Sequence, residues 1–287
     1  MPRSLKVKKS PIVTPSLLWR EGLSLRYLCM VFEWLKKLRA VARRIALPIR
    51  EERAPRNMGK IDLRPYTPEP KIFLGQLAYL KLTQFEILTD ELKFSPNTHY
   101  KAELSEAAAK SFEKYRAIAS ILAGLGFEAT DAMEPFTERI GNFHSRTTGM
   151  DWYETVIKVY LVYGLLDDFY RRLAVGLTPA LREQVEDALA DDTFEQFAKR
   201  VLVESMAESE QLKSRLALWG RRLMGDVLLE LRAAFDNRKL AGISKGSKLT
   251  IEQEREVNLA AYTKLEPLVG DMIAVHSLRM DALGLSA

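Results

Sequence analysis

The sequence predicts an all-α protein made of several long helices. Apolar residues recur at helical spacing over long stretches, and Pro, Gly, Asp and Thr stand where such stretches begin or end. Alternating runs bounded by Asn-Gly or Asp-Gly, which would indicate β-hairpins, are missing. A chain of 287 residues with 47% hydrophobic content can bury a sizeable core. The connections between the helices are mostly short, so we expect an all-α bundle.

The first 57 residues differ in composition from the rest. They carry 14 Lys and Arg against 4 Asp and Glu, a balance of +10, whereas residues 58–287 carry a balance of −5. No apolar stretch in this segment approaches the ~20 residues that a membrane span requires. We therefore predict a basic N-terminal extension over 1–57, a helical bundle over 58–240, and a linker with a C-terminal helix over 241–287.

Three interpretations of the extension remain open. Residues 25–49 can form a basic amphipathic helix that suits an anionic membrane surface or a partner groove. The extension can instead be a poorly ordered tail, or sequence upstream of a natural start at Met58. Its charge predicts weak, salt-sensitive contact with RNA or an anionic surface. The single Cys29 and the lack of a secretory signal predict a cytoplasmic protein.

Helix boundaries follow from the positions of a few residues. Pro70 and Pro179 suit the first turn of a helix, and Gly126 suits a C-terminal cap. Asp151, followed three residues later by Glu154, predicts a capping box, and Thr178 is expected to cap the helix that begins at Pro179. The helices expected in the bundle are 70–93, 101–125, a short one interrupted at Pro135, 151–176, 178–208 with a break at "ADDT", and 212–234.

The last expected helix lies beyond the bundle. It follows the connector "NRKLAGISKGSK" and runs from Thr250 to about Met280. Pro267 should kink or divide it, because proline removes a backbone donor and clashes with the preceding turn.

The familiar enzyme signatures are absent from the sequence. It has no G-x-S-x-G, no P-loop and no G-x-G-x-x-G, and one cysteine excludes zinc sites built on paired cysteines. The histidines, His99, His144 and His276, fall in separate segments. We interpret each of them as a surface or structural residue.

Acidic residues within apolar helices are the most informative feature. "YLVYGLLDDFYRRL" places Asp167 and Asp168 in a helix that is otherwise largely apolar, and Glu86 stands similarly in the first helix. A buried, unpaired carboxylate costs several kcal/mol, so these acids must meet water, a cation or a metal. Asp167 can also face solvent or pair with Arg171, one turn later.

Several segments of the chain resemble a known family. "FLGQLAYLKLTQFEIL", "AAAKSFEKYRAIASILAGLG", "AMEPF", "DWYETVIKVYLVYGLLDDFYRRLA" and "RLALWGRRLMGDVL" are similar to actinobacterial ferritin-like proteins grouped with the isopentenyl-adenosine tRNA hydroxylases. The resemblance covers about 70–234. It implies a four-helix bundle with a di-iron carboxylate centre that activates dioxygen. Such a centre takes a Glu from each of two helices and a Glu-x-x-His from each of the other two.

The sequence departs from this family pattern at most of the ligand positions. Glu86 and Asp168 match the lone carboxylates of the first and third helices, with Asp in place of Glu. On the second helix, Ser111 and Lys114 stand where Glu-x-x-His is expected. The fourth helix has acids but no histidine, and neither Glu-x-x-His nor Asp-x-x-His occurs in the chain. The acids of the fourth helix are Asp191, Asp192 and Glu195.

These departures lead to two functional hypotheses. In the first, Glu86 and Asp168 are remnant ligands, and Lys114 points inward and pairs with one of them, with Ser111 and Tyr115 as hydrogen-bond partners. The protein then has no cofactor, no assigned catalytic residue, and a binding or scaffold role. The alternative is a di-iron hydroxylase that uses iron and acts on modified adenosine in tRNA. The sequence names no partner; a homodimer is one option.

Overall fold

The computed structural model describes residues 62–234 and 249–286. The expected N-terminal extension, its amphipathic helix and the connector "NRKLAGISKGSK" lie outside the described residues. Within those ranges the chain forms helices and no strand, which confirms the all-α prediction. The longer helices are α2 (Pro70–Glu91), α3 (Thr98–Gly124), α9 (Thr193–Ala207), α10 (Glu210–Ala234) and α12 (Ile251–Asp281). The shorter ones are α4 (Ala129–Met133), α5 (Thr137–Arg146), α6 (Trp152–Lys158), α7 (Gly164–Leu173) and α8 (Pro179–Ala188).

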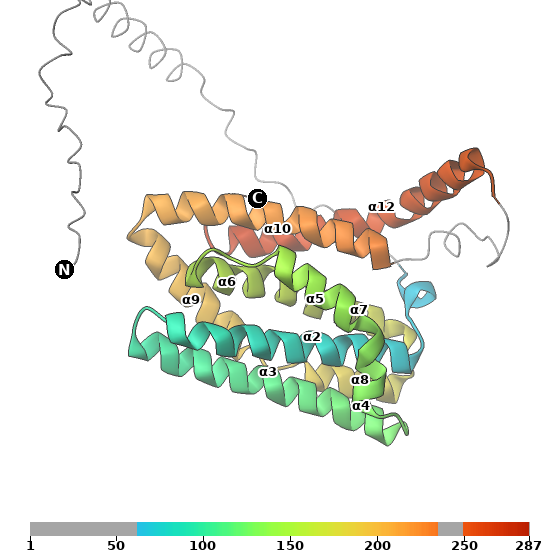
Figure 1. Cartoon of the computed structure of the whole chain (residues 1–287), viewed down its shortest axis with the longest axis horizontal. Helices are drawn as coiled ribbons and strands as arrows, with labels where there is room; N and C mark the ends of the chain where they lie inside the picture. Colours follow the sequence, from blue (N-terminus) through green and yellow to red (C-terminus); the bar gives the residue numbers. More distant parts are fainter. Residues whose placement is uncertain (1–61, 235–248, 287) are drawn as a thin grey trace, which may run out of the picture. The chain divides into compact units, whose positions relative to one another are not determined.

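Four helical rods make up the bundle. The first two are α2 and α3, which lie side by side (Figure 1). The third consists of α6, the turn η5 (Val159–Tyr163) and α7 in succession, and the fourth consists of α8 and α9. The expected break in the fourth rod falls between α8 and α9, at residues 189–192. The four-helix bundle predicted from the sequence is therefore present.

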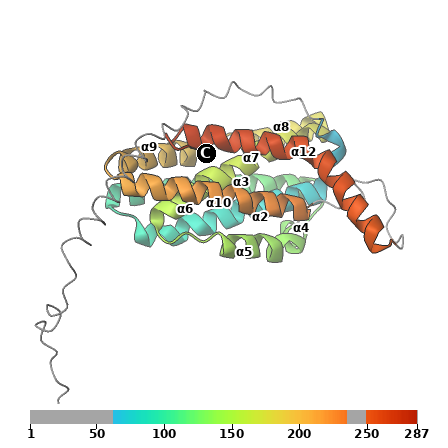
Figure 2. The same ribbon diagram turned by 90° about the horizontal axis from the view of Figure 1, so that it is seen from above.

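The remaining helices cover this bundle. Figure 1 shows α6 and α7 between the α2–α3 pair and the α10–α12 pair, in agreement with the contacts of α10 with α6 and of α12 with α7. Pro267 lies inside α12 without dividing it. Figure 2 shows α12 changing direction along its length, as a helix with an internal proline does. None of the helices in the described ranges is long and apolar enough to cross a membrane.

Most of the predicted helix ends agree with the structure, and the differences concern caps. α3 begins at Thr98, because the side chain of Asn97 accepts a hydrogen bond from the Tyr100 N–H. Asp151 caps α6 as expected, but Glu154 accepts from the N–H of Met150 rather than from that of Asp151. The capping box is therefore displaced by one residue. Thr178 stands at the N-cap position of α8, but its hydroxyl makes no capping hydrogen bond.

The third rod contains a turn that the sequence did not predict. Val159–Tyr163 forms a π-helical turn, and all of its side chains are buried. A π turn holds more residues than an α turn, so it changes the angular position of every residue that follows. Helical spacing counted from the start of α6 therefore does not decide whether Asp167 or Asp168 faces the core.

Candidate functional site

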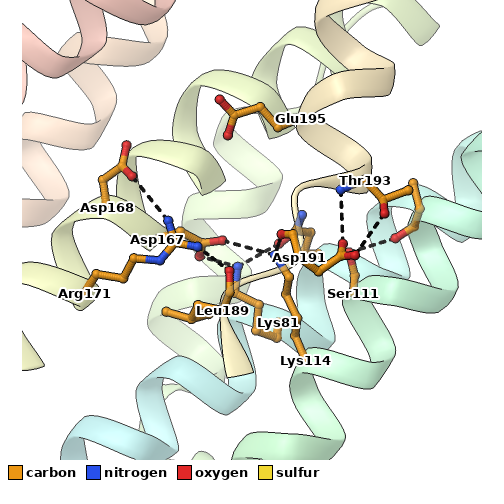
Figure 3. A network of polar contacts seen from close by, with 12 residues as sticks. Lys81, Ser111, Lys114, Asp167, Asp168, Arg171, Leu189, Asp191, Thr193 and Glu195 are labelled. Carbon is orange, nitrogen blue, oxygen red and sulfur yellow. Dashed lines mark hydrogen bonds and ion pairs between the residues drawn. The ribbon is translucent and has the colours of Figure 1, made fainter. Parts of the chain in front are cut away.

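A buried ion cluster lies between the rods of the bundle. Lys81 of α2 forms an ion pair with Asp167 of α7, and Lys114 of α3 places its Nζ 3.9 Å from Asp167 Oδ2 (Figure 3). The side chain of Lys81 is 1% exposed, and those of Asp167 and Lys114 are 13% and 12% exposed. Two ammonium groups thus share one carboxylate.

Lys81 is held inside the protein by the helix that carries it. It lies two turns from Leu74 on one side and from Leu88 on the other, and both leucines are buried. Its Nζ donates a hydrogen bond to Gln84 Oε1 at 2.9 Å. Burial lowers the pKa of Lys81; Asp167 opposes this effect, and the positive charge of Lys114 adds to it. Asp167 and Gln84 therefore offset only part of the cost of removing the Lys81 ammonium group from water.

Lys114 also fixes the break in the fourth rod. Its Nζ donates to the backbone carbonyl of Asp191 at 2.6 Å, and the guanidinium of Arg171 donates to that of Leu189 (Figure 3). The Asp191 carboxylate accepts from the N–H and the hydroxyl of Thr193 at 3.1 and 2.9 Å. These bonds satisfy backbone groups that the ends of α8 and α9 leave free.

The residues predicted from the sequence are not all in this cluster. The carboxylate that meets Lys114 is that of Asp167, not that of Glu86 or Asp168 as expected. The Glu86 side chain is exposed on α2. Ser111 is buried, but its hydroxyl donates to the Ala107 carbonyl of its own helix. Tyr115 packs its ring against that of Phe112, with the centroids 5.6 Å apart. Neither residue is a hydrogen-bond partner of Lys114 in the structure.

Asp168 points to a different partner, on α12. Its Oδ2 accepts a hydrogen bond from Arg279 at 2.8 Å, and Arg171 approaches its other oxygen at 3.7 Å. The guanidinium of Arg279 also lies 5.4 Å from the ring centroid of Tyr160. Gly164, one turn before Asp168, leaves the space that this guanidinium occupies. The second acid of the "DD" pair therefore joins α7 to the last helix.

A second buried lysine lies at the end of α6. Lys158 is fully buried, and its Nζ is 2.9 Å from His144 Nδ1 and 3.2 Å from the His144 carbonyl. Burial lowers the pKa of Lys158 to about 8, and the negative charge of Glu91 partly offsets this. Burial and the charge of Lys158 both lower the pKa of His144. The sequence carries no local signal for this pair, because its members lie on different helices, α5 and α6.

The residues between the rods do not suit a metal pair. The described part of the chain holds no group of three or more His, Cys, Asp or Glu side chains that could bind a metal ion. Asp168 is paired with Arg279, Asp191 bonds to Thr193, and two ammonium groups surround Asp167. A divalent cation next to Asp167 would be repelled by both lysines. A di-iron centre therefore does not fit the donor set that is present.

Part of this cluster could have been found in the sequence. Lys81 is a charged residue at the helical spacing of the buried leucines of α2, and that spacing is visible in the sequence. The sequence around Asp168 does not indicate its partner, because Arg279 lies 111 residues away in the chain.

The chain matches a family model. The model described as "Ferritin-like domain, actinomycetes" matches residues 69–245, which is more than half of the chain. The match includes the four rods of the bundle and excludes α12. No curated protein matches the chain.

Proposed function

Because the chain belongs to the ferritin-like domain family of actinomycetes, we propose that it is a member with a degenerate metal site and a binding or scaffold role. The observation that carries this proposal is the burial of Lys81 between the rods, where it shares Asp167 with Lys114. An ammonium group in this place supplies the positive charge that a carboxylate inside an apolar bundle needs. The acid is then neutralised without a metal.

The chemistry of the surrounding side chains supports the same conclusion. Metal-bound oxygen chemistry requires several carboxylate or imidazole ligands around one point. Of the two carboxylates that the family pattern assigns here, Glu86 is exposed and Asp168 neutralises Arg279. The histidines do not supply ligands here either. His99 is exposed, His144 contacts Lys158, and His276 is buried in α12. We propose that Lys81, Lys114 and Asp167 stabilise the bundle instead of catalysing a reaction.

Metal analysis of the full chain, purified without chelators and then incubated with Fe(II) under anaerobic conditions, tests the proposal. We expect far less than one iron atom per chain. A gain-of-site variant, Lys81→Ala with Ser111→Glu and Lys114→His, serves as the comparison, because it removes one cation and introduces Glu-x-x-His on α3. Two iron atoms per wild-type chain, or iron-dependent hydroxylation of isopentenyl-adenosine in tRNA, would overturn the proposal in favour of the hydroxylase.

A further inference from the structure

A partly open apolar cavity of about 240 Å³ lies against α2 and α7, and none of the residues of the ion cluster lines it. Its walls come from α2, α5, α7, α10 and α12 and from the segment before α2. Leu80 and Leu166 line the cavity, whereas their neighbours in the chain, Lys81 and Asp167, belong to the ion cluster. Protein interiors rarely leave voids larger than a water molecule, so a space of this size is suited to a ligand.

The size and lining of the cavity limit the ligand to a small, mainly apolar molecule. An apolar cavity of about 150 Å³ holds benzene, so this one has room for on the order of ten non-hydrogen atoms. Aromatic and aliphatic side chains form most of its wall, including Phe143, Phe169 and Met272. A ligand of this size would lose most of its contact with water by binding here.

The charged residues of the cavity favour an anion. Glu230 is neutralised by an ion pair with Arg146, which reaches it from α5. Arg139, also on α5, lines the cavity, is only partly exposed, and has no hydrogen-bond or ion-pair partner among the described residues. Arg139 also acts electrostatically on the buried hydroxyl of Tyr170, in the cavity wall. The cavity therefore carries one positive charge that no acid of the described chain neutralises.

The cavity lining also offers a second donor. The hydroxyl of Tyr170 donates to Gln76 Oε1 at 3.0 Å, and both residues line the cavity. The N–H₂ group of the Gln76 amide makes no hydrogen bond to a described residue and can donate to another partner. A guanidinium from α5 and an amide N–H₂ from α2, both lining the same cavity, are donors of the kind that a carboxylate accepts from.

We propose that this cavity binds a monocarboxylic acid with an apolar body of about eight carbon atoms, the carboxylate meeting Arg139 and Gln76. The inference gives a ligand class to the binding role proposed above and so rests on that role. The two can nevertheless fail separately, because neither Lys81 nor Asp167 lines the cavity. Iron content and ligand binding are therefore measured on the same preparation.

Calorimetry and ¹³C NMR with [1-¹³C]octanoate on the full chain test the proposal. Octanoate should bind in a one-to-one ratio, octylamine should not bind, and the bound carboxylate should titrate at lower pH than the free acid. Arg139→Gln should weaken octanoate binding by about tenfold or more and leave octan-1-ol unaffected, and Arg139→Lys should recover part of the loss. Arg116→Gln, a change at an exposed position on α3, is the control and should bind as the wild type does.

A variant that blocks the cavity tests whether octanoate binds there or elsewhere on the chain. Ile72 lines the cavity but is 43% exposed, so Ile72→Trp should fill the entrance without unfolding the protein and abolish octanoate binding. Leu278→Trp, at an exposed position outside the cavity, should have no effect. Octanoate binding that persists in Ile72→Trp, equal binding in Arg139→Gln, or no binding by the wild type would each overturn the proposal.

Discussion

Arg279 donates a hydrogen bond to Asp168 over 2.8 Å and so joins the last helix, α12, to the third rod of the bundle. Only 11% of the Arg279 side chain is exposed, against 32% of that of Asp168. A second ion pair, between Arg172 and the buried Asp271, joins the same two helices. α12 lies outside the matched family segment but shares buried charged groups with it. We therefore expect α12 to contribute to the stability of the bundle.

Asp168→Asn should destabilise the protein by about 1–3 kcal/mol, because it removes the nearer of the two carboxylates that face the mostly buried guanidinium of Arg279. The other carboxylate, that of Glu195, lies 3.4 Å away and is more exposed. Urea unfolding followed by circular dichroism measures the change. The control is Glu186→Gln, which breaks the exposed Arg182–Glu186 pair within α8 and should cost no more than about 0.5 kcal/mol. An equal decrease in the free energy of unfolding in the two variants would show that the Asp168–Arg279 pair between α7 and α12 stabilises the protein no more than an exposed ion pair does.

The ion cluster predicts strong coupling between Lys81 and Asp167. Asp167→Leu leaves the buried ammonium of Lys81 unpaired and should cost about 3–5 kcal/mol. The double variant Lys81→Met with Asp167→Leu replaces both charges with apolar groups and should lie within about 1–2 kcal/mol of the wild type. A double-mutant cycle in urea gives the coupling energy. Additive effects of the two single changes would contradict the ion pair.

The sequence predicted the helices better than the contacts between them. Capping residues and helical spacing act locally, so Pro70, Asp151 and Pro179 placed the starts of their helices correctly. The choice between Asp167 and Asp168 depended on the π-helical turn before them, which nothing in the sequence indicated. The pairing of Asp168 depended on how α12 packs, and a contact between residues so distant in the chain has no local signature. Tertiary packing thus decided the partners that helical spacing left open.

The lowered pKa of Lys158 should make the free energy of unfolding depend on pH. Its pKa is about 8 in the folded protein and 10.5 in the unfolded chain, so the unfolded state binds more protons between these values. Stability should therefore rise from pH 8 to pH 10.5, and the burial penalty, on the order of 3 kcal/mol, should be fully present below pH 8. Lys158→Met should be more stable than the wild type at pH 7, and this advantage should disappear near pH 10.5.

Thermal or urea unfolding of the Lys158→Met and wild-type proteins at several pH values measures this difference. Comparing the two proteins cancels the titration of the other lysines and tyrosines. Lys199→Met, at an exposed position on α9, should change stability little at any pH. A stability difference between Lys158→Met and wild type that stays constant from pH 7 to pH 10.5 would contradict the lowered pKa of Lys158.

Gly75 allows α2 to lie against α4, and its replacement tests how closely these helices pack. A Cβ atom at this position would overlap the backbone carbonyl of Ala132, which no side-chain rotation can relieve. Gly75→Ala should therefore cost about 1–3 kcal/mol, because α4 must move away from α2. Gly141, within α5, has nothing within 4 Å of such a Cβ, so Gly141→Ala should stabilise the protein by about 0.5–1 kcal/mol through its higher helix propensity. Opposite signs for the two substitutions in urea unfolding would support the close approach of α2 to Ala132, and a stabilising Gly75→Ala would refute it.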